Sequence, residues 1–258
     1  HLPGISWFLN DPYSGGTHLP DITVVTPAFH EGDLIGFAAN RAHHADVGGE
    51  VPGSMPADST TLDDEGVIIP PRILDEESIL EVVTLMRQPE QRRADLRAQL
   101  AANRSGASRL EQMAAERGAS GLAAAMADVI TYAENRTRAE IERIPDGVYR
   151  AADLLEARDG DLELRLEATV SGSDIRFDFN GSSGPDSGNL NCPRAVTESA
   201  CFFAIRVLTD PDIPASSGAW RPVEVLVPEE CLLNAAPPRA VVAGNVETSS
   251  RVADLCLS

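Results

Sequence analysis

The feature of this sequence that most constrains its fold is a stretch of helical hydrophobic spacing, residues 75–144, that lies between two stretches of non-helical pattern. It begins with Asp75-Glu76-Glu77, acidic residues that favour the first turn of a helix. Pro89 and Gly118 divide the stretch, a further break is predicted near Ser105-Gly106, and Pro145-Asp146-Gly147 ends it. The apolar positions with helical spacing are Ile79, Val82, Val83, Met86, Leu96, Leu100, Leu110, Met113, Leu122, Met126, Val129, Ile130 and Ile141.

Strands and turns are predicted on both sides of these helices. Residues 5–70 are rich in Gly, Pro and Asp and contain two β-like runs, 22–26 and 34–39. Residues 148–180 alternate with period two on either side of a hairpin turn at Gly172-Ser173-Asp174. A helix over about 194–208, a strand at 223–227 and a helix that starts after Thr248 complete the pattern.

Together these patterns predict an α+β fold. We expect an irregular β-layer in residues 1–74, long amphipathic helices in 75–145 and a mixed, β-rich portion in 146–258. The length of 258 residues is sufficient for one large or two ordinary domains. Because the last helical pattern is still running when the sequence stops, the chain is expected to be an incomplete part of a larger subunit.

Charge and residue usage exclude several classes of function. Lys and Arg number 21 against 40 Asp and Glu, and the formal net charge of −19 disfavours binding to nucleic acid or to a membrane. No apolar run is long enough to span a bilayer and no signal peptide opens the chain, so a cytoplasmic protein is expected. Every basic residue is arginine, which excludes a P-loop lysine or a Schiff-base lysine within this chain. The four cysteines lack C-x-x-C spacing and are interpreted as buried free thiols.

The first group of candidate functional residues follows the turn-forming segment Ser14-Gly15-Gly16. His18 and Asp21 stand there at a spacing of three, and we take them as the candidate catalytic pair. The alternative interpretation is a Gly-rich turn with a histidine on the surface.

The second group, His43-His44-Ala45-Asp46, directly follows a β-like run. Histidine and carboxylate in a short turn are suited to present two ligands to a divalent metal. His44 and Asp46 share a face if the segment is extended, and His43 and Asp46 do so if it coils. A hydrogen-bonded His–Asp pair that stabilises a loop is an equally good interpretation. Glu65 ends an acidic run that is otherwise typical of solvated surface, and it is a candidate for a further metal ligand.

Several long strings, in order along nearly the whole chain, resemble the hydantoinase B family. They are Asn10-Asp11-Pro12-Tyr13-Ser14-Gly15-Gly16-Thr17-His18-Leu19-Pro20-Asp21, Ala39-Asn40-Arg41-Ala42-His43-His44-Ala45-Asp46-Val47-Gly48-Gly49, Pro52-Gly53-Ser54-Met55-Pro56, Glu65-Gly66-Val67-Ile68-Ile69-Pro70-Pro71, Asp178-Phe179-Asn180-Gly181-Ser182-Ser183, Asn191-Cys192-Pro193-Arg194-Ala195-Val196-Thr197, Leu208-Thr209-Asp210-Pro211-Asp212-Ile213-Pro214 and Gly244-Asn245-Val246-Glu247-Thr248-Ser249. This family includes the B-type components of N-methylhydantoinases, the second half of 5-oxoprolinases, caprolactamase and a component of acetone and acetophenone carboxylases.

The resemblance implies a B-type subunit of an ATP-dependent cyclic-amide hydrolase. A hydantoinase A-type ATPase partner would phosphorylate a small cyclic amide, and this chain would hold zinc or manganese where the activated substrate reacts. The family's His-x-x-Asp metal motif is mapped onto His43 and Asp46, with Glu65 in place of a further histidine and with His18 and Asp21 beside them. The alternatives are a subunit of a ketone carboxylase, or a scaffold fragment without catalytic activity.

Overall fold

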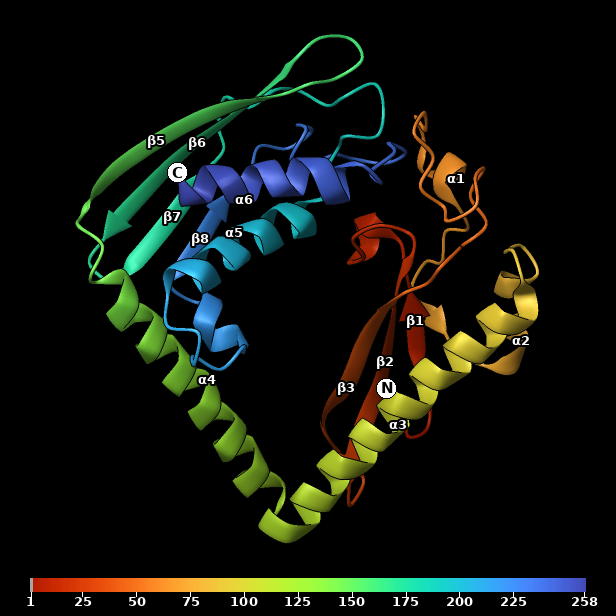
Figure 1. Cartoon of the computed structure of the whole chain (residues 1–258). Helices are drawn as coiled ribbons and strands as arrows, with labels where there is room; N and C mark the ends of the chain where they lie inside the picture. Colours follow the sequence, from red (N-terminus) through yellow and green to blue (C-terminus); the bar gives the residue numbers. More distant parts are fainter. Residues whose placement is uncertain (1) are drawn as a thin grey trace. The chain divides into compact units, whose positions relative to one another are not determined.

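The chain divides into two compact units, His1–Ala125 and Met126–Ser258, in a computed structural model that describes residues 2–258. Each unit contains one four-stranded sheet, and helices accompany both sheets (Figure 1). The predicted α+β class is therefore confirmed. The division into portions 1–74, 75–145 and 146–258 stays a prediction about domains.

The sheet of the first unit is antiparallel and has the strand order β3-β2-β1-β4. Its strands are β1 (Trp7–Leu9), β2 (Asp21–His30), β3 (Asp33–His43) and β4 (Arg72–Ile73). β2 and β3 form a long hairpin whose turn residues, Glu31 and Gly32, both have positive φ, 52° and 92°. A two-residue hairpin turn of this kind matches the twist of the strands that it joins. Both predicted runs, 22–26 and 34–39, lie inside these strands.

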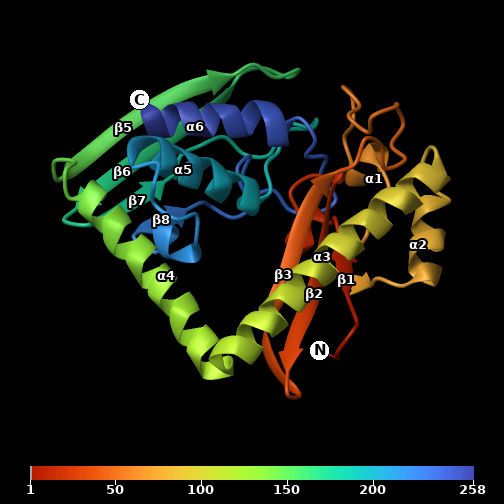
Figure 2. The ribbon, with the colours of Figure 1, turned by 60° about the horizontal axis from the view of Figure 1, so that its bottom comes forward.

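Four helices follow along the chain: α1 (Leu62–Glu65), α2 (Glu76–Val83), α3 (Pro89–Arg117) and α4 (Ala119–Ile141). In the first unit α3 runs along β2 and β3 (Figure 2). The buried residues of α3 include Leu96, Gln99 and Asn103. No helix in residues 2–258 is long and apolar enough to cross a membrane.

The predicted break near Ser105-Gly106 is wrong, because α3 continues through both residues. Gly106 faces β3, and a Cβ added to it would lie only 3.0 Å from the Cβ of Ala38. The glycine therefore permits a close approach of helix and strand instead of interrupting the helix. The predicted boundary at Gly118 is confirmed, since α3 ends there with φ +76°.

The second unit contains a sheet of order β5-β6-β7-β8, in which β8 is parallel to β7 and the other pairs are antiparallel. Its strands are β5 (Gly147–Leu155), β6 (Leu162–Ser171), β7 (Asp174–Asp178) and β8 (Val223–Leu226). The predicted hairpin turn is confirmed, because β6 ends at Ser171 and β7 begins at Asp174. The period-two pattern of β6 buries Leu164 and Leu166 on one face.

Two helices, α5 (Arg194–Leu208) and α6 (Ser249–Leu257), pack against this sheet and close its core. Both were predicted from the sequence. Within residues 2–258, no side-chain hydrogen bond caps the start of α6: Thr248 lies in a π-helical turn (Gly244–Thr248), and its hydroxyl donates to the Leu190 carbonyl. The four cysteines are free thiols, as predicted; Cys192, Cys201 and Cys231 are buried as expected, whereas Cys256 is only half-buried.

Candidate functional site

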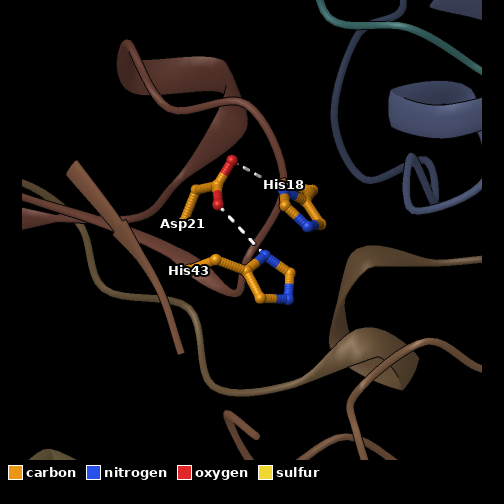
Figure 3. A group of neighbouring side chains, drawn as sticks. All are labelled: His18, Asp21 and His43. Atoms are coloured by element: carbon orange, nitrogen blue, oxygen red, sulfur yellow. Dashed lines mark hydrogen bonds and ion pairs between the residues drawn. The ribbon is translucent and has the colours of Figure 1, made fainter. Parts of the chain in front are cut away.

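Three side chains of the first unit, His18, Asp21 and His43, meet at one end of the β2–β3 hairpin (Figure 3). Asp21 is the first residue of β2 and His43 is the last residue of β3, and the antiparallel register places them opposite each other. His18 precedes β2 by three residues. One potential ligand atom from each residue lies within 4.8 Å of the others, which makes this a group able to hold a metal ion.

The carboxylate of Asp21 lies between the two imidazoles. His18 Nδ1 is 3.0 Å from Asp21 Oδ2, and His43 Nδ1 is 3.2 Å from Asp21 Oδ1. The two rings are stacked, with centroids 5.0 Å apart. The side chain of His18 is 4% exposed and that of His43 is 54% exposed, so the group is closed on one side and accessible to solvent on the other.

The loop that carries His18 is fixed by Asn10, a completely buried residue just after β1. The Asn10 side-chain amide donates to the carbonyls of Leu19 and Val67, and its oxygen accepts from the N–H of Ile69. Gly16 passes so close to this residue that an added Cβ would lie 2.5 Å from the Asn10 carbonyl oxygen. The glycine in the Ser-Gly-Gly segment is thus required by close packing beneath the site.

Electrostatics keep Asp21 ionised. Burial raises the pKa of this carboxyl, but the interactions with His18, the hydrogen bond from the Thr17 hydroxyl and the contact with His43 outweigh it, and the pKa falls to about 2. At neutral pH the group therefore presents one carboxylate and two imidazoles. This is a donor set that zinc and manganese accept.

Asp46 does not join His43, and the expected convergence of these two side chains is wrong. The Asp46 carboxylate accepts hydrogen bonds from the backbone N–H groups of Gly48 and Gly53, both at 2.8 Å, and pairs with Arg87 at 3.1 Å. Burial raises the pKa of Asp46, but these N–H groups and Arg87 outweigh it and hold the pKa below its ordinary value. The hydrogen bonds from Gly48 and Gly53 thus direct the Asp46 side chain toward the backbone of its own loop.

Glu65 and His44 do not belong to the group of three converging side chains either. Glu65, the last residue of α1, is completely buried and accepts a hydrogen bond from the Ser59 hydroxyl at 3.1 Å. His44 is buried on the helix side of the hairpin, where its Nε2 lies 2.8 Å from Gln99 Oε1. The grouping of His43 with Asp46 and Glu65 is therefore corrected to a grouping of His43 with His18 and Asp21.

One signal in the sequence fits the observed group. His18-Leu19-Pro20-Asp21 has the His-x-x-Asp spacing that was mapped onto residues 43–46. Both segments carry this spacing, so residue types alone do not separate them. Only the pairing of β2 with β3 assigns His43 to the earlier segment.

Comparison with known proteins agrees with the resemblance. The profile of the family Hydantoinase B/oxoprolinase matches residues 2–258. The 5-oxoprolinase 1 of Arabidopsis thaliana is 35% identical over 280 residues, which cover 96% of this chain and 22% of that protein. A protein of Pseudomonas sp. (strain NS671), whose name assigns it to the B-type subunits of D-/L-hydantoinases, is 29% identical over 266 residues, 95% of this chain and 45% of its own length.

A solved structure shows the same fold. The crystal structure of the ATP-dependent caprolactamase from Pseudomonas jessenii superposes with a TM-score of 0.92 at 24% identity, over 99% of this chain and 46% of the caprolactamase chain. The chain thus spans about half the length, or less, of the proteins that it matches. The family profile covers almost every residue, and by this match the chain belongs to the hydantoinase B/oxoprolinase family.

Proposed function

We propose that this chain is the metal-binding part of a B-type subunit of an ATP-dependent cyclic-amide hydrolase, and that His18, Asp21 and His43 hold a zinc or manganese ion. The observation that carries the proposal is the convergence of two imidazole rings on one carboxylate, with a potential ligand atom of each residue within 4.8 Å of the others. Nδ1 of the buried His18 lies 3.0 Å from Asp21 Oδ2, and Nδ1 of His43 lies 3.2 Å from Asp21 Oδ1. Two histidines and one carboxylate form a donor set that suits zinc or manganese.

The residues present fit such an ion. A bound divalent metal supplies Lewis acidity toward an oxygen atom of the substrate. Asp21 contributes a negative charge that persists at neutral pH, and the Thr17 hydroxyl, 2.8 Å from Asp21 Oδ2, orients that carboxylate. The half-exposed His43 leaves the site open on the side from which a small cyclic amide would enter.

ATP is assigned to a partner or to a separate part of a longer chain. One relative is named as a single component of a hydantoinase, and the named caprolactamase is ATP-dependent, which supports an arrangement in which a hydantoinase A-type ATPase activates the substrate. The 5-oxoprolinase match covers 22% of that protein, so most of its length lies outside the region shared with this chain. On this proposal the chain itself binds the metal and the activated amide.

The experiment uses the full-length subunit produced together with its ATPase partner. We expect ATP-dependent opening of one of three ring amides, 5-oxoproline, hydantoin or caprolactam, and mass spectrometry should find one zinc or manganese in each subunit. His18→Ala and His43→Ala should abolish both metal content and hydrolysis. Carboxylation of acetone by bicarbonate without amide hydrolysis would instead assign the ketone-carboxylase function.

Two further variants separate the observed group from other sets of ligands. His30→Ala removes a histidine from the opposite end of β2 and should change neither metal content nor hydrolysis. Asp46→Asn should lower stability while the folded protein keeps its metal. Loss of the metal from folded Asp46→Asn, together with its retention by His18→Ala, would contradict the proposed ligands.

A further inference from the structure

A row of buried and half-buried amide side chains lies between α3 and the β2–β3 hairpin, on the side of the sheet opposite the candidate metal ligands. Its members are Gln99 and Asn103 of α3 and Asn40 of β3, and His44 adjoins them. Gln99 and Asn103 are 7% and 3% exposed. Burying polar side chains in this way is costly unless each is hydrogen-bonded, so the row requires a physical explanation.

Gln99 is hydrogen-bonded at every polar atom of its side chain. Its Nε2 donates to the Ile22 carbonyl at 2.9 Å and to Asn40 Oδ1 at 2.8 Å, and its Oε1 lies 2.8 Å from His44 Nε2. Two carbonyl acceptors fix the orientation of the amide, so Oε1 must face the histidine. His44 Nε2 is therefore the protonated ring nitrogen and donates to Gln99.

These bonds connect the neighbours of two candidate ligands that belong to different strands. Ile22 directly follows Asp21 on β2, and His44 directly follows His43 at the end of β3. Successive side chains of a strand point to opposite faces, so Gln99 contacts the neighbours from the helix side while the ligands project from the other side. A single side chain thereby holds both strand ends from which Asp21 and His43 project, in addition to the backbone pairing that joins them.

We propose that Gln99 is a positioning residue for the metal centre: it acts through Ile22 and His44 and sets the geometry of Asp21 and His43 without touching the ion. This inference rests on the proposed function, because it assumes that these residues bind a metal. Residues that orient metal ligands typically change metal affinity by about 10–100-fold when they are replaced. Because Gln99 contacts the neighbours of the ligands and not the ligands themselves, we expect its replacement to weaken metal binding by about tenfold, the lower end of this range.

Asn103 provides a matched control on the same face of the same helix. Its Nδ2 donates to the Val24 carbonyl at 2.7 Å, so it makes the same kind of amide-to-strand bond as Gln99. Val24, however, lies three residues along β2 from Asp21 and is not adjacent to a ligand. Replacing Asn103 should loosen the packing of helix and sheet without displacing the ends of the strands.

The test compares Gln99→Met and Asn103→Leu in the full-length subunit, with Zn²⁺ and Mn²⁺ as probes in calorimetric titrations. Urea unfolding of the metal-free protein serves as the structural readout. Both variants should lower the urea midpoint, but only Gln99→Met should weaken metal binding, by about tenfold. Gln99→Asn, which keeps the amide but withdraws it by one methylene, replaces Gln99→Met if the latter does not fold.

Two results would overturn the inference: wild-type metal affinity in the Gln99 variant, or an equal loss of affinity in Asn103→Leu. The second result would mean that any loosening of α3 weakens the site. Failure of the proposed function looks different, because then the wild-type protein itself binds neither ion, or His18→Ala and His43→Ala bind it as well as the wild type.

Discussion

Replacing Asn10 by leucine tests how the loop that carries His18 is held. Asn10 is completely buried, and its side chain connects this loop at Leu19 with Val67 and Ile69. Leucine has nearly the same shape as asparagine but neither donates nor accepts hydrogen bonds. The substitution therefore removes three hydrogen bonds without leaving a large cavity.

The expected loss of stability follows from these bonds. Their lengths are 2.9, 2.9 and 2.6 Å, and all three partners are backbone groups. One such bond contributes about 0.5–1.5 kcal/mol net, and each buried partner left unsatisfied costs about 1–3 kcal/mol. Because neighbouring groups relax, we expect Asn10→Leu to lower the free energy of unfolding of the first unit by about 3–5 kcal/mol.

The assay relies on the distribution of tryptophan, since Trp7 lies in the first unit and Trp220 in the second. In a Trp220→Phe background, the fluorescence of Trp7 reports urea unfolding of the first unit. Ser105→Ala is the control: it removes an exposed hydrogen bond from α3 and should change the free energy of unfolding by less than about 0.5 kcal/mol. A loss below about 1 kcal/mol for Asn10→Leu would refute the role given to this residue.

Three other outcomes follow from the structure. The folded protein lowers the pKa of Asp46, so the charge of this carboxylate stabilises the fold at pH values above its ordinary pKa of 3.8. This stabilisation is lost as the pH falls through the lower pKa of the folded state. Urea midpoints measured from pH 6 down to 2 should therefore fall less steeply in Asp46→Asn than in the wild type. Gly106→Val should destabilise the first unit by about 1–3 kcal/mol in the same unfolding assay, because the new side chain would crowd the Cβ of Ala38. Its counterpart Gly121→Ala in α4, whose added Cβ has its nearest neighbour at 3.5 Å, should stabilise the first unit by about 0.4–1 kcal/mol. Zn²⁺ or Mn²⁺ at a free concentration of 100 times its Kd should raise the free energy of unfolding by about 2.7 kcal/mol; calorimetric melting should show this gain abolished by His43→Ala, and its persistence would contradict the proposed ligands.

The sequence by itself determined the secondary structure of most of the chain and the chemistry available to it. The boundaries near Gly118 and Gly172, the helices over 194–208 and 249–257, and the alternation of β6 all depend on local period and turn residues, which a sequence displays directly. The exception at Gly106 has a tertiary cause. A glycine in a helix is locally unfavourable, and only the nearby Ala38 of β3 accounts for its presence.

The tertiary structure alone decided which candidate residues meet. His43 stands three residues from Asp46 in the sequence and 22 from Asp21, yet it contacts Asp21, because the hairpin register aligns the two ends of β2 and β3. Asp46 was an equally plausible partner by spacing, but the backbone N–H groups of Gly48 and Gly53 and the guanidinium of Arg87 bind it instead. Residue types and spacing predict the ligands that a chain can offer, whereas long-range strand pairing and local backbone hydrogen bonds determine where each of them points.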